Sequence, residues 1–225
     1  MCCRYCIEKT PYFEALAKRA QQATLRSGMP DVHRGSVYHF GEISPGNTVP
    51  VIAYGRSGRQ IAFQMYWGFT VKTGSLIPNA RSETAAEKPM FRDSWAAHRC
   101  IIPASWYYEW EHAKTPDGKT VTGQKYLIQP SGMDKTFLCG IYRLEGGAPH
   151  FAVLTREPAD KIRFIHDRMP LILPESLIDE WINPGSDPAK VAEKALTEME
   201  YAKAEEEYKP TSLAYFVDPK KYHQE

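Results

Sequence analysis

The sequence predicts a single α+β domain, and three observations lead to that prediction. Many short runs rich in aromatic and β-branched residues are separated by glycine-bearing turns. A few stretches instead show apolar residues at helical spacing. At 225 residues, with 43% hydrophobic and 12% aromatic side chains, the chain can bury a sizeable core and does not have the composition of a disordered protein. Many strands with few helices are typical of an α+β domain.

In the first part of the chain, Thr10-Pro11 forms a helix start, since threonine is a good N-cap and proline suits the first turn. Apolar residues at helical spacing follow, and Gly28 is a plausible end. From there to Gly46 the periodicity fades, which predicts a loop that ends in a turn at Pro45-Gly46. Strands are expected over residues 3–7, 49–54 and 61–69.

The second part begins with a helical pattern over residues 85–95, which Pro89 should interrupt. Asp187-Pro188 opens a longer apolar pattern, with Met199 and Ala202 on one side, that predicts a helix ending in the acidic run at residues 205–207. Residues 184–225 are therefore interpreted as a helical C-terminal extension of the single domain 1–225. A further helix is expected over residues 175–182, and strands over 100–103, 106–110, 126–129, 137–144, 151–155 and 171–173.

Charge and cysteine content indicate the partners and the redox compartment that suit this chain. With 28 basic and 27 acidic side chains, the whole chain neither requires nor excludes a polyanionic partner. Five cysteines are an odd number and suit a reduced cytoplasm better than a disulfide framework. We expect a cytoplasmic protein, because the sequence has no secretion signal and no apolar run of membrane-spanning length.

The chain end Met1-Cys2-Cys3-Arg4 carries the most suggestive chemistry. If Met1 is removed, Cys2 presents an α-amine and a thiol on adjacent carbons. An aldehyde condenses with such an amine to a Schiff base, and the neighbouring sulfur then closes a five-membered thiazolidine. The alternative is that Cys2 is simply an early residue of a buried strand.

Other polar residues are candidates for a site. Glu109 lies among aromatic residues, where partial desolvation would raise its pKa and suit a general acid or base, although the alternating pattern alone favours the solvent face. His166 is followed by a carboxylate and a guanidinium, a dense polar group between apolar flanks. Asn79 and Arg81 would point the same way on an extended chain, but a surface turn with a helix cap explains them nearly as well.

A metal site is not expected. The closely spaced Cys2, Cys3 and Cys6 lack the second short-spaced ligand pair that zinc sites usually show. We expect no cofactor.

Taken together, these segments resemble one known family. The chain contains Cys2 with Arg4, Ser44-Pro45-Gly46, Trp67-Gly68, Asn79-Ala80-Arg81 with Glu83-Thr84, Tyr108-Glu109-Trp110 and His166-Asp167-Arg168-Met169-Pro170, in that order. This arrangement is similar to the SRAP family (SOS-response-associated peptidases) from residue 2 to about Trp181. The resemblance implies a mostly antiparallel, barrel-like β core flanked by several helices.

The resemblance also implies a function and its residues. Family members link covalently to abasic sites in single-stranded DNA, so the expected partner is such DNA, with no membrane, and the expected protein is a monomer, nucleoid-associated when bound. Cys2 would be the nucleophile, Asn79 would hold the adduct, and Glu109 and His166 would transfer protons. The same chemistry implies self-cleavage of Met1 and a weak strand-cleaving lyase activity. Residues expected at the DNA are Arg4, Pro45, Arg81, Thr155 and Arg168.

The sequence departs from the family pattern at several places. Cys3 stands where glycine usually follows the nucleophile, and Ser105-Trp106 replaces the usual Asp-Gly. The segment 71–75 lacks the tryptophans that wedge against DNA in relatives. Two other functions remain open: an N-terminal-nucleophile amidohydrolase or peptidase that uses Cys2, and a non-catalytic nucleic-acid-binding module with a structural cysteine.

Overall fold

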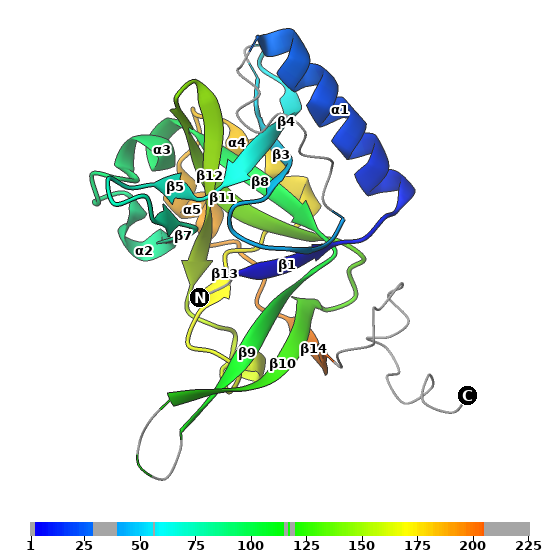
Figure 1. Ribbon diagram of the computed structural model, residues 1–225, viewed down its shortest axis with the longest axis vertical. Helices are drawn as coiled ribbons and strands as arrows, with labels where there is room; N and C mark the ends of the chain where they lie inside the picture. The colour runs from blue at the N-terminus through cyan, green and yellow to red at the C-terminus, as the bar shows by residue number, and fades with distance from the viewer. Residues whose placement is uncertain (1–2, 29–39, 56, 115–116, 118–119, 205–225) are drawn as a thin grey trace.

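The structure is a computed structural model that describes residues 3–28, 40–55, 57–114, 117 and 120–204. Its centre is a five-stranded barrel closed by successive strand pairs around a ring (Figure 1). Among the five strand pairs of this ring, only β4–β12 is parallel, so the core is mostly antiparallel, as predicted. The barrel strands, in ring order, are β11 (Thr136–Glu145), β8 (Arg99–Ala104), β3 (Thr48–Tyr54), β4 (Gln60–Trp67) and β12 (Ala148–Arg156).

A second, antiparallel sheet lies against the barrel, and its two longest strands form a ribbon that extends away from it (Figure 1). Its strands, in spatial order, are β14 (Met199–Lys203), β10 (Thr120–Pro130), β9 (Trp106–Lys114), β1 (Arg4–Ile7) and β2 (Gly41–Ile43). The smaller strands are β5 (Phe69–Thr70), β6 (Leu76–Ile77), β7 (Asn79–Arg81) and β13 (Met169–Pro170).

Helix α1 (Pro11–Ser27) covers β3 and β4 on one side of the barrel. Its ends are those predicted, because Thr10 accepts a hydrogen bond from the Phe13 N–H and Gly28 adopts φ 67°. The predicted helix around Pro89 is divided into α2 (Ser82–Ala85) and α3 (Arg92–Ala97), with the proline between them. The remaining helical segments are η1 (Asp160–Ile162), η2 (Glu175–Leu177), α4 (Ile178–Ile182) and α5 (Pro188–Ala192).

The predicted long helix that starts at Asp187 is wrong. Helix α5 ends at Ala192, and Met199–Lys203 forms strand β14, which pairs with β10. The apolar residues that suggest a helical face, Met199 and Ala202, are buried in this strand instead. Pairing with a distant strand outweighed the local helical pattern. The acidic run at residues 205–207, where the helix was expected to end, lies outside the described residues.

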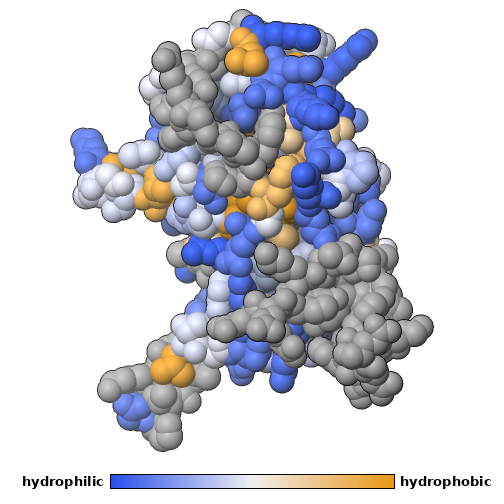
Figure 2. Space-filling model, turned by 45° about the vertical axis from the view of Figure 1, so that its right-hand side comes forward, coloured by the Kyte–Doolittle hydropathy of each residue, from blue (hydrophilic) through white to orange (hydrophobic). Residues whose placement is uncertain are grey.

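The core forms one large cluster through the barrel, with Trp67 and Trp181 among its largest fully buried side chains. Arg99 is also fully buried, and its guanidinium donates to the carbonyls of Trp95 and Trp181, near the ends of α3 and α4. These carbonyls lack intrahelical partners, so the buried charge is satisfied by helix ends. Figure 2 shows that hydrophilic residues cover much of one face, while hydrophobic residues that reach the surface gather near its middle.

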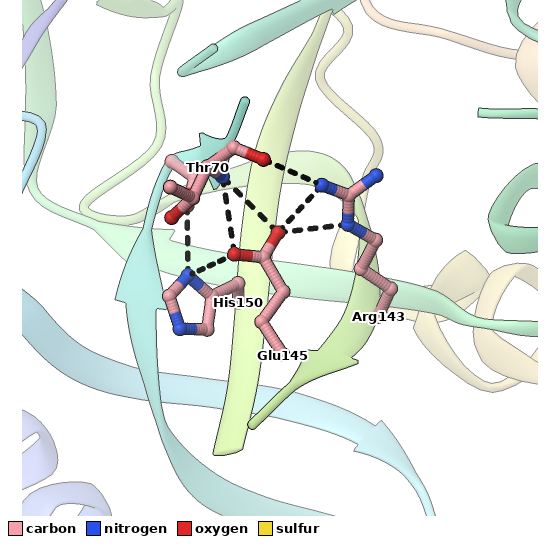
Figure 3. Close-up of polar contacts among 5 residues, drawn as sticks. Thr70, Arg143, Glu145 and His150 are labelled. Atoms are coloured by element: carbon pink, nitrogen blue, oxygen red, sulfur yellow. Dashed lines mark hydrogen bonds and ion pairs between the residues drawn. The ribbon is translucent and has the colours of Figure 1, made fainter. Parts of the chain in front are cut away.

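The β5–β6 hairpin is anchored to the barrel by a polar cluster (Figure 3). The Glu145 carboxylate accepts from the Thr70 N–H at 3.1 Å, while Arg143 donates to the Thr70 carbonyl at 3.0 Å. His150 Nδ1 lies 3.0 Å from the Gly68 carbonyl oxygen and 3.4 Å from Glu145. Both backbone groups of Thr70 are thus bound by side chains, which fixes the position of the turn at residues 71–75.

Candidate active site

Strand register brings the predicted site residues to one end of the barrel. Strand β7 runs parallel to β12, with Asn79 opposite Val153 and Arg81 opposite Thr155. Strand β13 pairs with the same end of β12, and β1 pairs with β9 so that Arg4 lies opposite Tyr108 (Figure 1). The segments that carry Asn79, Glu109 and His166, and the first described residues of the chain, therefore meet in one place.

The centre of the site is a buried pair of titratable side chains. Glu109 Oε1 lies 3.2 Å from His166 Nε2, and each side chain is 5% exposed. The solvent-face position that strand alternation alone favours for Glu109 is therefore wrong. Strand β9 is covered on this side by the segment after β12, since the His112 N–H donates to the Ile165 carbonyl. A carboxyl and an imidazole in this arrangement can exchange a proton.

Burial shifts both pKa values towards the neutral forms. It raises the pKa of Glu109 to about 7 and lowers that of His166 to about 4. Near neutral pH the His166 imidazole is therefore uncharged, and Glu109 is present both as the neutral carboxylic acid and as the carboxylate. This is the protonation range in which a side chain can serve as both general acid and general base.

The second nitrogen of His166 also has partners. The backbone N–H of Arg168 donates to Nδ1 at 3.0 Å, and Asp167 Oδ1 lies 2.8 Å from the same nitrogen. When Nδ1 accepts from Arg168, Nε2–H can donate to an ionised Glu109. When Nδ1 carries the proton, it faces Asp167, and Nε2 can accept from protonated Glu109. Each neutral tautomer is thus stabilised, as proton exchange requires.

Asn79 and Cys3 form the neighbouring part of the site. The Asn79 Nδ2 donates to Cys3 Sγ at 3.7 Å, and Asn79 is 7% exposed. Its Oδ1 is buried and has no hydrogen-bond partner among the described residues. Burial raises the pKa of the Cys3 thiol, which is therefore protonated at neutral pH. The predicted nucleophile, Cys2, lies outside the described residues.

The three predicted DNA-contacting arginines differ in their surroundings. Arg81 is exposed and makes no ion pair with the described residues. Arg168 makes a bidentate pair with Glu83, at 2.9 and 2.8 Å, and also donates to the Thr155 carbonyl at 2.7 Å. Burial alone would raise the pKa of Glu83, but the hydrogen bonds from Arg168 hold this pKa below its usual range.

Arg4 is paired as well. Its Nε lies 3.1 Å from Glu42 Oε1, and Lys125 binds the other oxygen of the same carboxylate at 2.6 Å. Sequence reasoning did not find Glu42 or Glu83 as partners of these arginines. Neither is close in sequence to its arginine, so only the strand register brings each pair together.

The other two predicted DNA contacts are less accessible. Thr155 is 1% exposed, and its hydroxyl donates to the Ala80 carbonyl at 3.4 Å. Its contribution to the site in this structure is to hold Arg168 through its carbonyl. Pro45 is half-buried in the predicted turn after β2, which pairs with β1.

The family model of the SOS response associated peptidases (SRAP) matches residues 1–212. The chain belongs to the SRAP family. It is similar to two proteins of Bacillus subtilis (strain 168): 34% identical over 158 residues to the abasic site processing protein YobE, and 37% over 123 residues to the abasic site processing protein YoaM. These alignments cover 65% and 52% of this chain, and 69% and 52% of the relatives; the chain thus spans about half the length of YoaM.

The SRAP fold is also found among solved structures. A crystal structure of a protein from Bacteroides thetaiotaomicron has a TM-score of 0.64 at 21% identity, with 91% of this chain and 93% of that chain covered. The segments that contain Asn79, Glu109 and His166 converge within this fold.

The described residues were also compared with the requirements of a metal site and of a membrane-spanning helix. Within the described ranges, no group of three His, Cys, Asp or Glu side chains is arranged to hold a metal ion. Among those same residues, no helix is long and apolar enough to cross a membrane.

Proposed function

We propose that this SRAP protein captures abasic sites in single-stranded DNA as a covalent adduct on Cys2, after removal of Met1. The observation that supports this most strongly is the buried Glu109–His166 pair, which lies in the same site as Asn79 and Cys3. Cys3 is joined to Cys2 by one peptide bond. The names of the relatives YobE and YoaM, abasic site processing proteins, agree with this substrate.

The proposed reaction forms two bonds and releases one water molecule. The Cys2 amine adds to the aldehyde carbon of the ring-opened deoxyribose, and loss of the hydroxyl as water leaves an imine. The thiolate sulfur then bonds to the imine carbon, and the thiol proton ends on the ring nitrogen. The product is a thiazolidine, which only a residue with a free amine and a thiol on adjacent carbons can form.

The acid and base roles fall to the buried pair. Opening of the sugar ring and loss of water each need a proton donor near neutral pH, and the raised pKa of Glu109 suits that task. His166 takes up or returns the proton at the imine stage, because its Nε2 is 3.2 Å from Glu109. The buried Oδ1 of Asn79, which has no hydrogen-bond partner among the described residues, can accept a hydrogen bond from a sugar hydroxyl or from the adduct nitrogen.

DNA recognition is proposed to rest on phosphate contacts around this site. Arg81 is an exposed cation two residues from Asn79 on β7, and it can bind a phosphate without giving up an ion pair to any described residue. Arg4 and Arg168 would bind DNA in addition to, or in exchange for, their contacts with Glu42 and Glu83. A single strand is the expected form, because the sugar at an abasic site within a duplex is hard to reach.

The same amine chemistry accounts for two accompanying activities. The family's self-cleavage of Met1 would expose the Cys2 amine. An imine that is not trapped by sulfur acidifies the neighbouring carbon, so loss of that proton and departure of the 3′ phosphate would cut the strand. We propose this as a weak lyase activity of the same site.

The test is incubation of the purified protein with single-stranded DNA that contains one abasic site. We expect an adduct that resists denaturation in the wild type and is absent in Cys2→Ala. Amide hydrolysis without an adduct would instead indicate an N-terminal-nucleophile amidohydrolase. DNA binding without either activity would indicate a non-catalytic binding module with a structural cysteine.

A further inference from the structure

A cleft of about 540 Å³ lies beside the Glu109–His166 pair and shares His166 as part of its wall. Pockets for small ligands commonly have volumes of about 300–1,000 Å³. The cleft is large enough for a nucleobase, and it lies between the end of β9 and the segment that follows β12. Its lining residues are His112, Glu157, Pro158, Arg163, Phe164, Ile165, His166 and Asp167.

The walls of the cleft are held in place by contacts between these two segments. The His112 N–H donates to the Ile165 carbonyl at 3.2 Å, and the His112 ring centroid is 4.2 Å from that of His166. Any ligand in the cleft would therefore be directly next to a predicted catalytic side chain. His112 and Phe164 lie outside the segments that resemble the SRAP family.

Phe164 is the unusual member of this wall because it is 49% exposed. Its ring packs against two tyrosines at steep angles, 87° to Tyr126 at 5.6 Å and 66° to Tyr201 at 5.2 Å between centroids. These edge contacts fix the orientation of the phenyl ring while half of its surface stays accessible. A rigid, exposed aromatic ring at the mouth of a cleft is suited to stacking with a planar ligand.

The charges around the cleft favour a base over a phosphate. Glu157 and Asp167 are exposed carboxylates, and Arg163 is already paired with Asp160 at 3.0 Å. A phosphate would be repelled by the two carboxylates, whereas the amino groups of a nucleobase can donate to them. The turn at residues 71–75, by contrast, has no aromatic side chain that could stack on a base.

We propose that this cleft binds the nucleobase next to the abasic site, stacked on Phe164 and with its amino group directed to Asp167 or Glu157. The inference rests on the proposed function and adds a second contact to the same DNA strand. It predicts a preference for a neighbouring cytosine, adenine or guanine over thymine, which has no exocyclic amino group.

The experiment uses fluorescently labelled single-stranded oligonucleotides with a central tetrahydrofuran, an abasic analogue that has no aldehyde and so measures binding alone. One probe carries cytosine on both sides of the analogue, a second carries thymine, and a third carries tetrahydrofuran at those positions as well. We expect Phe164→Ala to weaken binding of the cytosine probe roughly tenfold and to leave the third probe unchanged. Phe164→Leu, which keeps apolar packing on the tyrosines, should show a similar selective loss.

The matched control is Leu144→Ala, which truncates another exposed large apolar residue, 60% exposed, on β11. It should leave all three affinities unchanged. An equal loss on the first and third probes, or no loss on either for both Phe164 variants, would overturn the inference. Adduct formation by the wild type with a true abasic site is measured in parallel, so that failure of the proposed function is seen separately.

Discussion

Glu109 Oε1 and His166 Nε2 lie 3.2 Å apart in a site where both side chains are almost fully buried. Burial favours the uncharged form of each, so between about pH 4.5 and 6.5 the pair shares one proton, held on Glu109, instead of forming an ion pair. This relationship links the chemistry of the site to the stability of the fold, and both can be measured.

The opposite pKa shifts of Glu109 and His166 should cancel in their effect on the free energy of unfolding. The intact pair should therefore add no pH dependence to stability in this range. Between about pH 4.5 and 6.5 the unfolded chain binds one proton, on the histidine. The folded chain also binds one, on Glu109, since the pKa of Glu109 is raised to about 7 and that of His166 is lowered to about 4. Equal proton binding means no slope from this pair.

Substitution of either residue alone should make the free energy of unfolding depend on pH, with slopes of opposite sign in the two variants. In Glu109→Gln only His166 remains; its lowered pKa makes stability rise with pH between about 4 and 6.5. In His166→Gln only Glu109 remains; its raised pKa makes stability fall as pH rises from about 4.5 to 7. Over its full pH range, each change is on the order of 3 kcal/mol. Urea unfolding at pH 5 and pH 7 measures the slopes relative to wild type, and slopes of the same sign would contradict the shared proton.

Glu109→Gln should also slow adduct formation by about 100-fold or more, because general acid–base catalysis typically contributes that much. Affinity for DNA with a tetrahydrofuran site should stay nearly unchanged, since the carboxyl is buried and is not a phosphate contact. Glu111→Gln, two residues further along β9, is the matched control. Rates from denaturing gels and affinities from anisotropy separate the two effects, and an equal loss in both would rule out the catalytic role.

Arg81→Ala should weaken binding of single-stranded DNA and reduce the dependence of affinity on salt by about one phosphate contact. The reason is that Arg81 is exposed and has no ion pair among the described residues, so its charge is available to the phosphate. Arg26→Ala, at the exposed end of α1, serves as the control. Binding constants over a salt titration give the slopes, and an Arg81 variant with the wild-type slope would exclude this contact.

Cys3→Ala should form the adduct at a rate within a few-fold of wild type. Burial raises the pKa of the Cys3 thiol, and the Cys3 nitrogen is in a peptide bond, so Cys3 has neither a ready thiolate nor a free amine. Time courses of adduct formation compare this variant with Cys2→Ala, which should be inactive. Loss of the adduct in Cys3→Ala, with the fold retained, would show that the second sulfur takes part.

Elements with local signals could be predicted from the sequence. Helix α1 was predicted at both ends because Thr10 and Gly28 act through their own backbone neighbours. Strand β14 could not be predicted, because Met199 and Ala202 have a helical spacing. This segment forms a strand only by pairing with β10. Strand β2, within the predicted loop, was missed for the same reason, since it exists through its pairing with β1.

The site residues also divide into those with a local sequence signal and those that depend on long-range contacts. Asn79, Glu109 and His166 could be predicted as candidates because each lies in a dense polar or aromatic motif. The aromatic neighbours of Glu109 indicated its partial desolvation, although strand alternation pointed to the solvent face. The pairing of Arg168 with Glu83 depends on long-range register and had no sequence signal. The contact of His112 with His166, and the exposure of Phe164 beside it, likewise follow from tertiary packing alone.

The most direct test of the central claim is peptide mapping of the adduct by mass spectrometry. The wild-type protein is crosslinked to single-stranded DNA that contains one abasic site, and the DNA and protein are then digested. We predict that the sugar remnant is found on a peptide that begins at Cys2 without Met1, with the mass of a condensation product that has lost one water. A remnant on a lysine, on Cys3, or on a peptide that retains Met1 would contradict capture by the Cys2 amine and thiol.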